Sequence, residues 1–312
     1  MSGLIPLLVL NTHAPEYRAL IDQSYDAVYA PTPAERTAVI AEQGARFRAV
    51  LTIGVIGLTA AEMDAMPALE LVCAMGAGYE GIDVAAARER GIVVANGAGT
   101  NDDCVADHAF GLLIATVRGI VRLDSQCRAG IWRDALPMPL NFSGKRLGIL
   151  GMGTIGQKIA KRAAGFDLEI GYHNRKPREG ATHRYFDSLD ALAEWCDFLV
   201  VATPGGPGTK HLINARVLDA LGPKGFVVNI ARGSVVDTEA LAAALRDKRI
   251  GGAGLDVYES EPKRPEALIG LDNVVLTPHL AGWSPEAILS SLRRFIENAD
   301  GHFAGRGPVS PV

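Results

Sequence analysis

The chain has 312 residues, about two domains of ordinary size. It is 48% hydrophobic and 21% charged, and 31 Lys and Arg against 35 Asp and Glu give a formal net charge of −4. This balance excludes a strongly basic nucleic-acid binder, and the 6% aromatic content argues against a stacking platform for single strands. We expect a folded protein of two domains with no nucleic-acid partner.

The sequence gives no indication of a metal site, a disulfide framework or a membrane span. The cysteines lie far apart without Cys-x-x-Cys spacing, so reduced and buried thiols are expected at Cys73, Cys104, Cys127 and Cys196. No stretch approaches the roughly 20 apolar residues that cross a bilayer, and residues 4–10 lack the basic leader of a secretory signal. We therefore expect a cytoplasmic protein that binds neither a metal nor a membrane.

Short strand-like runs alternate with helical stretches along the whole chain. Strands are expected at residues 4–10, 49–55, 71–75, 92–95, 146–150, 168–172, 198–202, 226–230, 254–257 and 274–276. Helices are expected at residues 155–165, 214–221 and 238–246, and longer ones at 102–128 and 284–303. The alternation is typical of βαβ units with parallel sheets, which indicates an α/β fold. The two long helices predict the crossing points between domains, one of residues 1–100 and 285–312, the other of residues 101–284.

The strongest local signal is Arg146-Leu-Gly-Ile-Leu-Gly151-Met-Gly153-Thr-Ile-Gly156, a strand-like run that leads into Gly-x-Gly-x-x-Gly and a helix. Gly151 permits a tight turn, Gly153 lets the backbone approach a pyrophosphate, and Gly156 allows close packing of helix on strand. The helix N-terminus then offers N–H groups to the phosphates. This pattern predicts dinucleotide binding, whereas a glycine-rich packing turn is the alternative.

The end of the next strand indicates which dinucleotide binds. An NAD site usually places Asp or Glu there for the ribose 2′-hydroxyl, but this strand ends in His173-Asn174-Arg175-Lys176, with no acid until Glu179. Guanidinium and ammonium groups suit a 2′-phosphate, so we expect NADP(H) in preference to NAD(H). A solvated basic loop that contacts nothing is the alternative.

Three later strand-like runs end in polar residues at Arg232, Glu261 and His279. Ligand groups gather at the carboxyl ends of strands in open α/β sheets, so these side chains are expected to converge. A guanidinium binds a substrate carboxylate and polarises a carbonyl, a histidine delivers a proton near neutrality, and a carboxylate orients the imidazole. Together they predict reduction of a 2-oxo acid, although each residue alone has a structural interpretation as an ion pair, a core histidine or a cap.

These residues resemble the D-isomer-specific 2-hydroxy-acid dehydrogenases, and most of all their NADPH-preferring glyoxylate/hydroxypyruvate reductases and the related hydroxyphenylpyruvate reductases. The resemblance covers almost the whole chain. Its motifs are Met75-Gly-Ala-Gly-Tyr-Glu-Gly-Ile-Asp83, Thr100-Asn-Asp-Asp-Cys-Val-Ala-Asp-His108, Gly151-Met-Gly-Thr-Ile-Gly156, Thr203-Pro-Gly-Gly-Pro-Gly-Thr209, Asn229-Ile-Ala-Arg-Gly233, Gly252-Ala-Gly-Leu-Asp-Val-Tyr258, Thr277-Pro-His279 and the ending His302-Phe-Ala-Gly-Arg306. The resemblance implies two Rossmann-like doubly wound domains with a cleft between them, a flavodoxin-like substrate domain and an NAD(P)-binding domain.

The resemblance also implies residue roles. His279 is the expected general acid/base, Glu261 its partner, and Arg232 the ligand of the substrate carboxylate and carbonyl. The backbone of Gly76, Ala77 and Gly78 is expected to bind the substrate carboxylate. Cofactor contacts are expected at Thr100, Gly151, Met152, Gly153, Thr154, Ile155, Gly156, Asn174, Arg175, Lys176, Thr203, Pro204, Thr209, Ile230, Ala231, Arg232, Asp256 and His279. Among these, Asp256 would receive the nicotinamide carboxamide.

Two segments depart from the family pattern, so details there are expected to differ. Residues 203–209 carry Gly-Gly-Pro-Gly where relatives often have Leu-Thr, and Trp283 follows His279 where small residues are usual. Trp283 either narrows the pocket toward small substrates or packs against the hinge. A homodimer joined through the dinucleotide-binding domain is implied, with residues 128–132 as an arm, unless Trp132 belongs to the core of its own subunit.

Other functions stay open at this point. Reduction of a bulkier aryl pyruvate is one alternative within the same family. Formate dehydrogenases share this pattern without the Glu–His pair, so Glu261 argues against that activity. A dinucleotide-sensing binding protein, like the transcriptional corepressors with this fold, is an alternative of another class.

Overall fold

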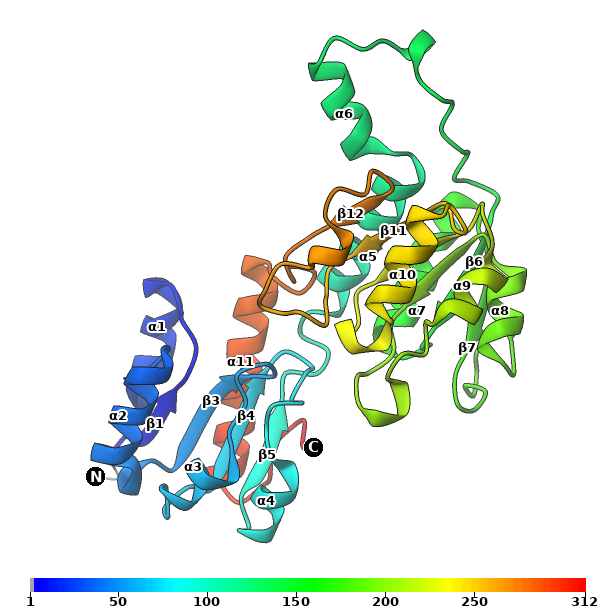
Figure 1. The fold of residues 1–312 in the computed structure, drawn as a ribbon. Helices are drawn as coiled ribbons and strands as arrows, with labels where there is room; N and C mark the ends of the chain where they lie inside the picture. The colour runs from blue at the N-terminus through cyan, green and yellow to red at the C-terminus, as the bar shows by residue number, and fades with distance from the viewer. Residues whose placement is uncertain (1–2) are drawn as a thin grey trace. The chain divides into compact units, whose positions relative to one another are not determined.

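The computed structural model describes residues 3–312 (Figure 1). The chain divides into two compact units, one of Met1–Asn101 with Gly282–Val312, the other of Asp102–Ala281. Each unit holds one parallel sheet with helices packed on it. The predicted fold class, α/β with two Rossmann-like domains, is confirmed.

The first unit is built on a five-stranded parallel sheet in the order β2-β1-β3-β4-β5. Its elements are β1 (Ile5–Val9), α1 (Pro15–Asp22), β2 (Tyr25–Tyr29), α2 (Pro33–Gln43), β3 (Ala49–Ile53), α3 (Ala60–Asp64), β4 (Leu71–Met75), α4 (Val84–Glu89), β5 (Val93–Asn96) and α11 (Pro285–Phe303). Apolar residues on one face of the sheet pack against α1 and α11, and those on the other face against α2, α3 and α4. The strand order reverses between β1 and β3, which both pair with their neighbours in parallel register.

The second unit is built on a seven-stranded parallel sheet in the order β12-β11-β10-β9-β6-β7-β8. Its strands are β6 (Arg146–Leu150), β7 (Glu169–His173), β8 (Arg184–Tyr185), β9 (Phe198–Val201), β10 (Phe226–Asn229), β11 (Gly252–Leu255) and β12 (Val274–Leu276). Its helices are α5 (Asp102–Val117), α6 (Ile120–Arg128), α7 (Thr154–Ala163), α8 (Leu189–Trp195), α9 (Ala215–Leu221) and α10 (Thr238–Arg246). Helices α5 and α7 cover one face, and α8, α9 and α10 the other.

The expectation of a single helix over residues 102–128 is wrong, because the structure has two helices there. Gly119 lies between α5 and α6 with φ +62°, a left-handed conformation that interrupts the helical hydrogen bonds. The two helices are bent by 57° at this point. Two strands were also missed, β2 at the edge of the first sheet and the two-residue β8.

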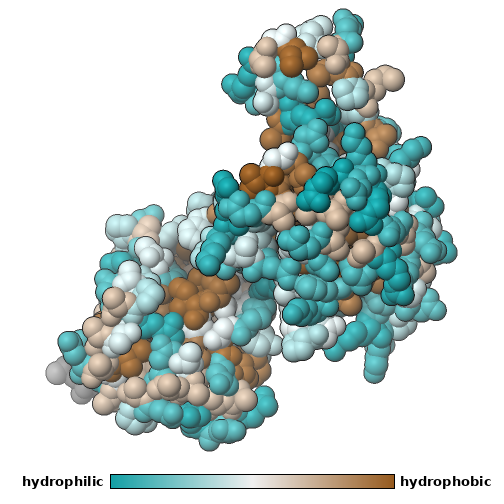
Figure 2. All heavy atoms as spheres, viewed as in Figure 1, coloured by the Kyte–Doolittle hydropathy of each residue, from teal (hydrophilic) through white to brown (hydrophobic). Residues whose placement is uncertain are grey.

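Helix α6 and the segment after it stand off from the sheet of the second unit (Figure 1). Helix α6 has no buried residue. Trp132 exposes 68% of its surface and Met138 exposes 94%, and apolar atoms are visible on this arm in Figure 2. The alternative that Trp132 belongs to the core of its own subunit is therefore wrong.

The structure corrects the expectation that all four thiols are buried. All four thiols are free, and Cys73 and Cys196 are buried as expected, but Cys127 is exposed on α6. Burial raises the pKa of Cys196 to about 12, so that thiol stays protonated.

Within residues 3–312 no single helix is long and apolar enough to cross a bilayer, although α5 and α6 together, across their bend, reach that length and composition.

Candidate active site

The glycine-rich turn after β6 has the shape of a phosphate-binding turn. Gly151 has φ +101°, and a Cβ there would lie 2.6 Å from the carbonyl oxygen of Ala202. A Cβ at Gly156 would lie 2.1 Å from the carbonyl oxygen of Gly151, so only glycine lets α7 begin this close to the turn. A Cβ at Gly153, in contrast, would meet no atom within 4 Å. Open space therefore lies where a pyrophosphate is expected to approach the backbone.

The start of α7 and the tip of β7 are tied to this turn. No side chain caps α7, whose first residues are Thr154 and Ile155. Asn174 instead accepts a hydrogen bond from the N–H of Met152 at 2.8 Å, and the Met152 side chain is buried. Asn174 thus holds the turn, and the uncapped N–H groups of α7 are left for an anion.

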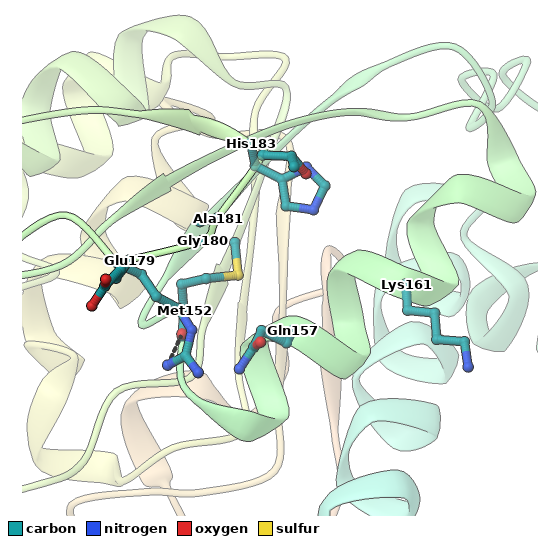
Figure 3. A pocket seen from close by; sticks show the side chains of 9 residues that line it. Met152, Gln157, Lys161, Glu179, Gly180, Ala181 and His183 are labelled. Atoms are coloured by element: carbon teal, nitrogen blue, oxygen red, sulfur yellow. Dashed lines mark hydrogen bonds between the residues drawn. The ribbon is translucent and has the colours of Figure 1, made fainter.

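A cavity of about 310 Å³ lies beside this turn, between α7 and the loop after β7 (Figure 3). Lys161, Arg178 and His183 line it together with Met152 and Glu179. The Arg178 guanidinium donates to the carbonyl oxygen of Met152 at 3.2 Å, and the backbone N–H of Arg178 donates to the Tyr172 hydroxyl at 3.0 Å. Two cationic side chains, those of Lys161 and Arg178, therefore lie in this cavity next to the glycine-rich turn.

The remaining expected cofactor contacts of the second unit fall into two groups. Arg175 and Lys176 are exposed after β7, and Thr203 and Pro204 follow β9 after Ala202. Thr209 donates its hydroxyl to the carbonyl oxygens of Pro204 and Gly206, at 2.9 and 3.2 Å, so it closes its own loop.

The residues after β10 form a tight turn that positions Arg232. Asn229 is fully buried, accepts a hydrogen bond from the N–H of Ala231 and donates to the carbonyl oxygen of Arg232. A Cβ at Gly233 would lie 1.9 Å from the carbonyl carbon of Tyr258, so glycine allows this turn to contact the segment before Glu261. Ile230 and Ala231 are buried, and Arg232 is partly exposed at the end of the turn.

Glu261 and His279 form a hydrogen-bonded pair in the same unit. Nδ1 of His279 lies 2.8 Å from Oε2 of Glu261, and Oε1 of Glu261 accepts from the N–H of Tyr258 at 2.7 Å. The His279 side chain is 39% exposed and that of Glu261 26%. The contact through Nδ1 leaves Nε2 as the ring nitrogen that can face a substrate.

Electrostatics favour the charged form of both partners. The hydrogen bond to Glu261 raises the pKa of His279 above its usual range, against the opposing effects of burial and of the Arg232 charge. Burial acts to raise the pKa of Glu261, but its hydrogen bonds from His279 and Tyr258 and the nearby charges of His279 and Arg232 lower it overall. Arg232 thus lies near enough to Glu261 and His279 for its charge to act on both, and the catalytic roles of the three residues stay a prediction.

Asp256 holds the segment that carries His279. Its side chain is fully buried. Oδ1 accepts from the Thr277 hydroxyl at 2.6 Å and from the N–H of Leu280, and Oδ2 accepts from the N–H of Ala281. The carbonyl oxygen of Asp256 accepts from the N–H of His279, whose φ of +56° is unusual for a residue with a side chain. The geometry thus gives Asp256 a positioning role, and its expected contact with a carboxamide stays a prediction.

The first unit contributes a turn of small residues after β4. Gly76 has φ +74°, and the carbonyl oxygens of Gly76 and Ala77 accept from the N–H of Gly97 and the Asn96 amide. Among residues 3–312 the N–H groups of Ala77 and Gly78 donate to no other residue. Thr100, near this turn in sequence, hydrogen-bonds to Gly97 and Ser291. The turn therefore offers two N–H groups to a ligand.

Comparison with known proteins gives one family. Residues 110–281 match the family model of the D-isomer specific 2-hydroxyacid dehydrogenase NAD binding domain. The 2-ketogluconate reductase of Gluconobacter oxydans is 38% identical over 313 residues, which cover 100% of both chains. The hydroxyphenylpyruvate reductase of Plectranthus scutellarioides is 41% identical over 91% of each chain.

The chain belongs to the D-isomer specific 2-hydroxyacid dehydrogenases. It is similar along its whole length to the NADPH-dependent glyoxylate/hydroxypyruvate reductase of Sinorhizobium meliloti, solved with NADP and malonate, with a TM-score of 0.91 and 37% identity over 99% of this chain and 97% of the other. The resemblance stated from the motifs is thus confirmed. The second unit is the NAD-binding domain of this family, and the protein is an oxidoreductase.

Several residues of this 2-hydroxyacid dehydrogenase escaped the sequence analysis. His108 on α5 lies 2.9 Å from the Thr277 hydroxyl and 3.5 Å from Asp256, so it belongs to the network behind His279. Its place in a recognised motif was the available signal. Arg178, beside the glycine-rich turn, follows the basic tip of β7 by two residues and could have been found as part of the same run. Within residues 3–312 no cluster of His, Cys, Asp or Glu could hold a metal ion.

Proposed function

We propose that this protein reduces small 2-oxo acids, of the glyoxylate and hydroxypyruvate type, to D-2-hydroxy acids, with NADPH as the preferred cofactor. The observation that carries the proposal is the convergence of Arg232, Glu261 and His279 in one unit, with His279 held by Glu261 at 2.8 Å. These three groups match what reduction of a carbonyl next to a carboxylate requires. NADPH, when bound, supplies the hydride.

His279 is the proposed proton donor. Reduction leaves a negative charge on the substrate oxygen, and the Nε2 proton of the imidazolium neutralises it as the hydroxyl forms. Glu261 keeps the ring protonated and fixes which nitrogen faces the substrate. Arg232 binds the substrate carboxylate and polarises the carbonyl, which stabilises the charge that develops during reduction.

The turn at Gly76, Ala77 and Gly78 is the second proposed carboxylate ligand. Its two unpaired N–H groups, at Ala77 and Gly78, suit an anion of this size. Backbone donors select a carboxylate without adding a further charge, so Arg232 stays the one cation proposed to bind it. Discrimination among 2-oxo acids then depends on what surrounds the rest of the substrate.

Preference for NADPH is supported by cationic side chains at the cofactor end of the second unit. Arg175 and Lys176 follow β7, where an NAD site would carry an acid, and Arg178 and Lys161 line the adjacent cavity. A charged hydrogen bond contributes about 1.5–3 kcal/mol, or roughly tenfold to a hundredfold in affinity. The Sinorhizobium meliloti relative was solved with NADP, which supports the same preference.

Steady-state kinetics test the function and the cofactor together. Consumption of NADPH and of NADH is followed with glyoxylate, hydroxypyruvate and hydroxyphenylpyruvate, and we expect turnover of the smaller acids and higher kcat/KM with NADPH. The double variant Arg175→Ala/Lys176→Ala should lower the selectivity for NADPH over NADH by about tenfold or more. The variant Lys224→Ala, which removes an exposed charge elsewhere in the unit, should not change this selectivity.

Two results would contradict the proposal. Equal or better efficiency with NADH would overturn the cofactor preference. No turnover with any of the three acids would favour a dinucleotide-sensing binding protein, and turnover of the aryl substrate alone would favour an aryl pyruvate reductase.

We also propose that the protein forms a homodimer through the NAD-binding unit. We further propose that it lies in the reducing cytoplasm. Support for the dimer comes from the apolar surface of the arm and of the segment after it, where Ile131, Trp132 and Met138 are exposed. Support for the location comes from the free thiols and from the absence of a disulfide among residues 3–312. Sedimentation of the wild type and of Trp132→Glu tests the dimer, since the variant should be monomeric, and a wild type that sediments as a monomer would contradict it.

A further inference from the structure

The reversal of strand order in the first unit marks a place where a ligand is expected. In open α/β sheets, ligands bind outside the carboxyl ends of strands where the order reverses, here between β1 and β3. The loop after β3 contacts the turn after β4, since a Cβ at Gly54 would lie 2.7 Å from the carbonyl oxygen of Gly78. The loop after β1 carries Asn11 and His13, two buried polar residues to which no function has yet been given.

Asn11 has one hydrogen-bonding atom without a partner. Its Nδ2 lies 3.0 Å from Nε2 of His13 and 3.5 Å from Sδ of Met75, the residue directly before Gly76. Its Oδ1 is buried and accepts no hydrogen bond within residues 3–312. Asn11 is only 8% exposed, and buried amide oxygens are nearly always paired.

The neighbours of Asn11 determine which end of the amide is unpaired. The thioether of Met75 is an acceptor only, so Nδ2 faces it. Burial, with a contribution from the Arg18 charge, lowers the pKa of His13 to about 4, so its ring is neutral near pH 7 and its Nε2 can accept from the same Nδ2. The atom that lacks a partner is therefore an acceptor, and it calls for a donor from a ligand.

We propose that Oδ1 of Asn11 accepts a hydrogen bond from a hydroxyl group of the substrate, so that the first unit selects hydroxylated 2-oxo acids. This inference rests on the proposed function, in which the carboxylate binds the turn at Ala77 and Gly78. Asn11 contacts Met75, the residue directly before Gly76, so it lies in the same unit as the turn that is proposed to bind the carboxylate.

The chemistry explains why this contact discriminates between substrates. A site built to hydrogen-bond a hydroxyl rejects the analogue that lacks it, because the acceptor is then left unpaired. Hydroxypyruvate and pyruvate differ only by the hydroxyl on the third carbon. The structure therefore assigns Asn11 as a specificity-determining residue, with His13 as the residue that orients its amide.

The test compares kcat/KM for hydroxypyruvate and for pyruvate, with NADPH, in the wild type and in Asn11→Leu. Leucine has a similar size and no hydrogen-bonding group. The wild type should favour hydroxypyruvate by about tenfold or more, and Asn11→Leu should lose about that factor. Because both substrates are measured on the same variant, any general loss of activity cancels in the ratio.

Asn298→Ala is the matched control. Asn298 is also a buried amide of the first unit, but its nitrogen donates to Asn96 and Ser310 and its oxygen accepts from Ser310, so its removal should leave the substrate ratio unchanged. The same ratio in the wild type and in Asn11→Leu would overturn the assignment. If Asn11→Leu does not fold, a wild-type ratio near one overturns it. Failure of the proposed function is distinct, because the wild type would then turn over neither these acids nor glyoxylate.

Discussion

Two histidine–glutamate pairs lie close together in the NAD-binding unit, and they have different roles. Glu261 holds His279 through Nδ1 at 2.8 Å, and Glu259 holds His211 through Nε2 at 2.7 Å. Both histidines have left-handed backbone conformations, with φ of +56° and +51°. The side chains are also similarly exposed, 39% for His279 and 37% for His211.

The groups around each carboxylate distinguish the pairs. Oε2 of Glu259 accepts from both the N–H and the hydroxyl of Thr238, at the start of α10, so this pair links His211 to the first residue of a helix. Glu261 is instead close enough to Arg232 for the guanidinium charge to lower its pKa. A histidine–glutamate pair alone therefore does not identify a proton donor, and the adjoining cation does.

Replacing each of the two histidines by glutamine should give the largest difference in kcat between the two pairs. His279→Gln should lower kcat by about 10²–10⁴, the factor typical of a positioned acid or base. His211→Gln removes the other pair and should lower kcat by no more than about threefold, since only a partly exposed hydrogen bond is lost. Steady-state kinetics with NADPH and a 2-oxo acid measure both. Comparable losses in the two variants would contradict the assignment.

Neutralising the two carboxylates should show the same contrast on a smaller scale. Glu261→Gln removes the charge that favours the imidazolium, and we expect kcat to fall by about tenfold to a hundredfold. Glu259→Gln keeps the shape of the second pair and should leave kcat within about twofold of the wild type. An equal effect of the two substitutions would mean that the pair at His279 is structural.

Gly205 leaves room for the side chain of Arg232, the cation that distinguishes the two pairs. A Cβ at Gly205 would lie 2.8 Å from Cγ of Arg232, too close for that side chain to keep its position. Gly205→Ala should displace Arg232 and raise KM for the 2-oxo acid by about tenfold. Gly208→Ala, in the same loop, is the control, because a Cβ there meets no atom within 4 Å. An unchanged KM in Gly205→Ala would show that Arg232 does not bind substrate from this position.

The smallest expected effect is on stability. Glu259→Gln weakens the hydrogen bonds to His211 and Thr238 and should lower the free energy of unfolding by about 1 kcal/mol. Burial acts to raise the pKa of Glu259, but the hydrogen bonds from Thr238 and His211 lower it overall. Its contribution is therefore present above the carboxyl pKa of the unfolded chain and is lost as the pH falls through the lowered value. Denaturant unfolding of the wild type and the variant, at neutral and acidic pH, measures this, and equal stabilities at neutral pH would contradict it.

The fold and the reactive groups could be predicted because each follows from a local signal. Parallel strands bring their carboxyl ends to one edge, so Arg232, Glu261 and His279 could be expected to converge from their places after strand-like runs. The glycines of the dinucleotide-binding turn could be predicted equally well, since the backbone leaves no room for a side chain at Gly151 or Gly156.

What escaped prediction depends on contacts between distant segments. Nothing in the sequence shows that Asn11 meets Met75, 64 residues away, or that its oxygen lacks a partner. Gly119 could have been suspected as a break, but a single glycine within a helical pattern does not determine the bend. Asp256 was recognised by its motif, whereas its bonds to Leu280 and Ala281 depend on how the chain returns after β12.

The central claim, that the imidazolium of His279 donates the proton, is tested most directly by the pH dependence of kcat/KM for reduction in the wild type and in Glu261→Gln. Because Glu261 raises the pKa of His279, reduction should be fastest below that raised value and fall as the pH rises through it. The descent should begin above the ordinary histidine pKa of about 6.5 and move to lower pH in Glu261→Gln. A descent at the same pH in both proteins would contradict the account.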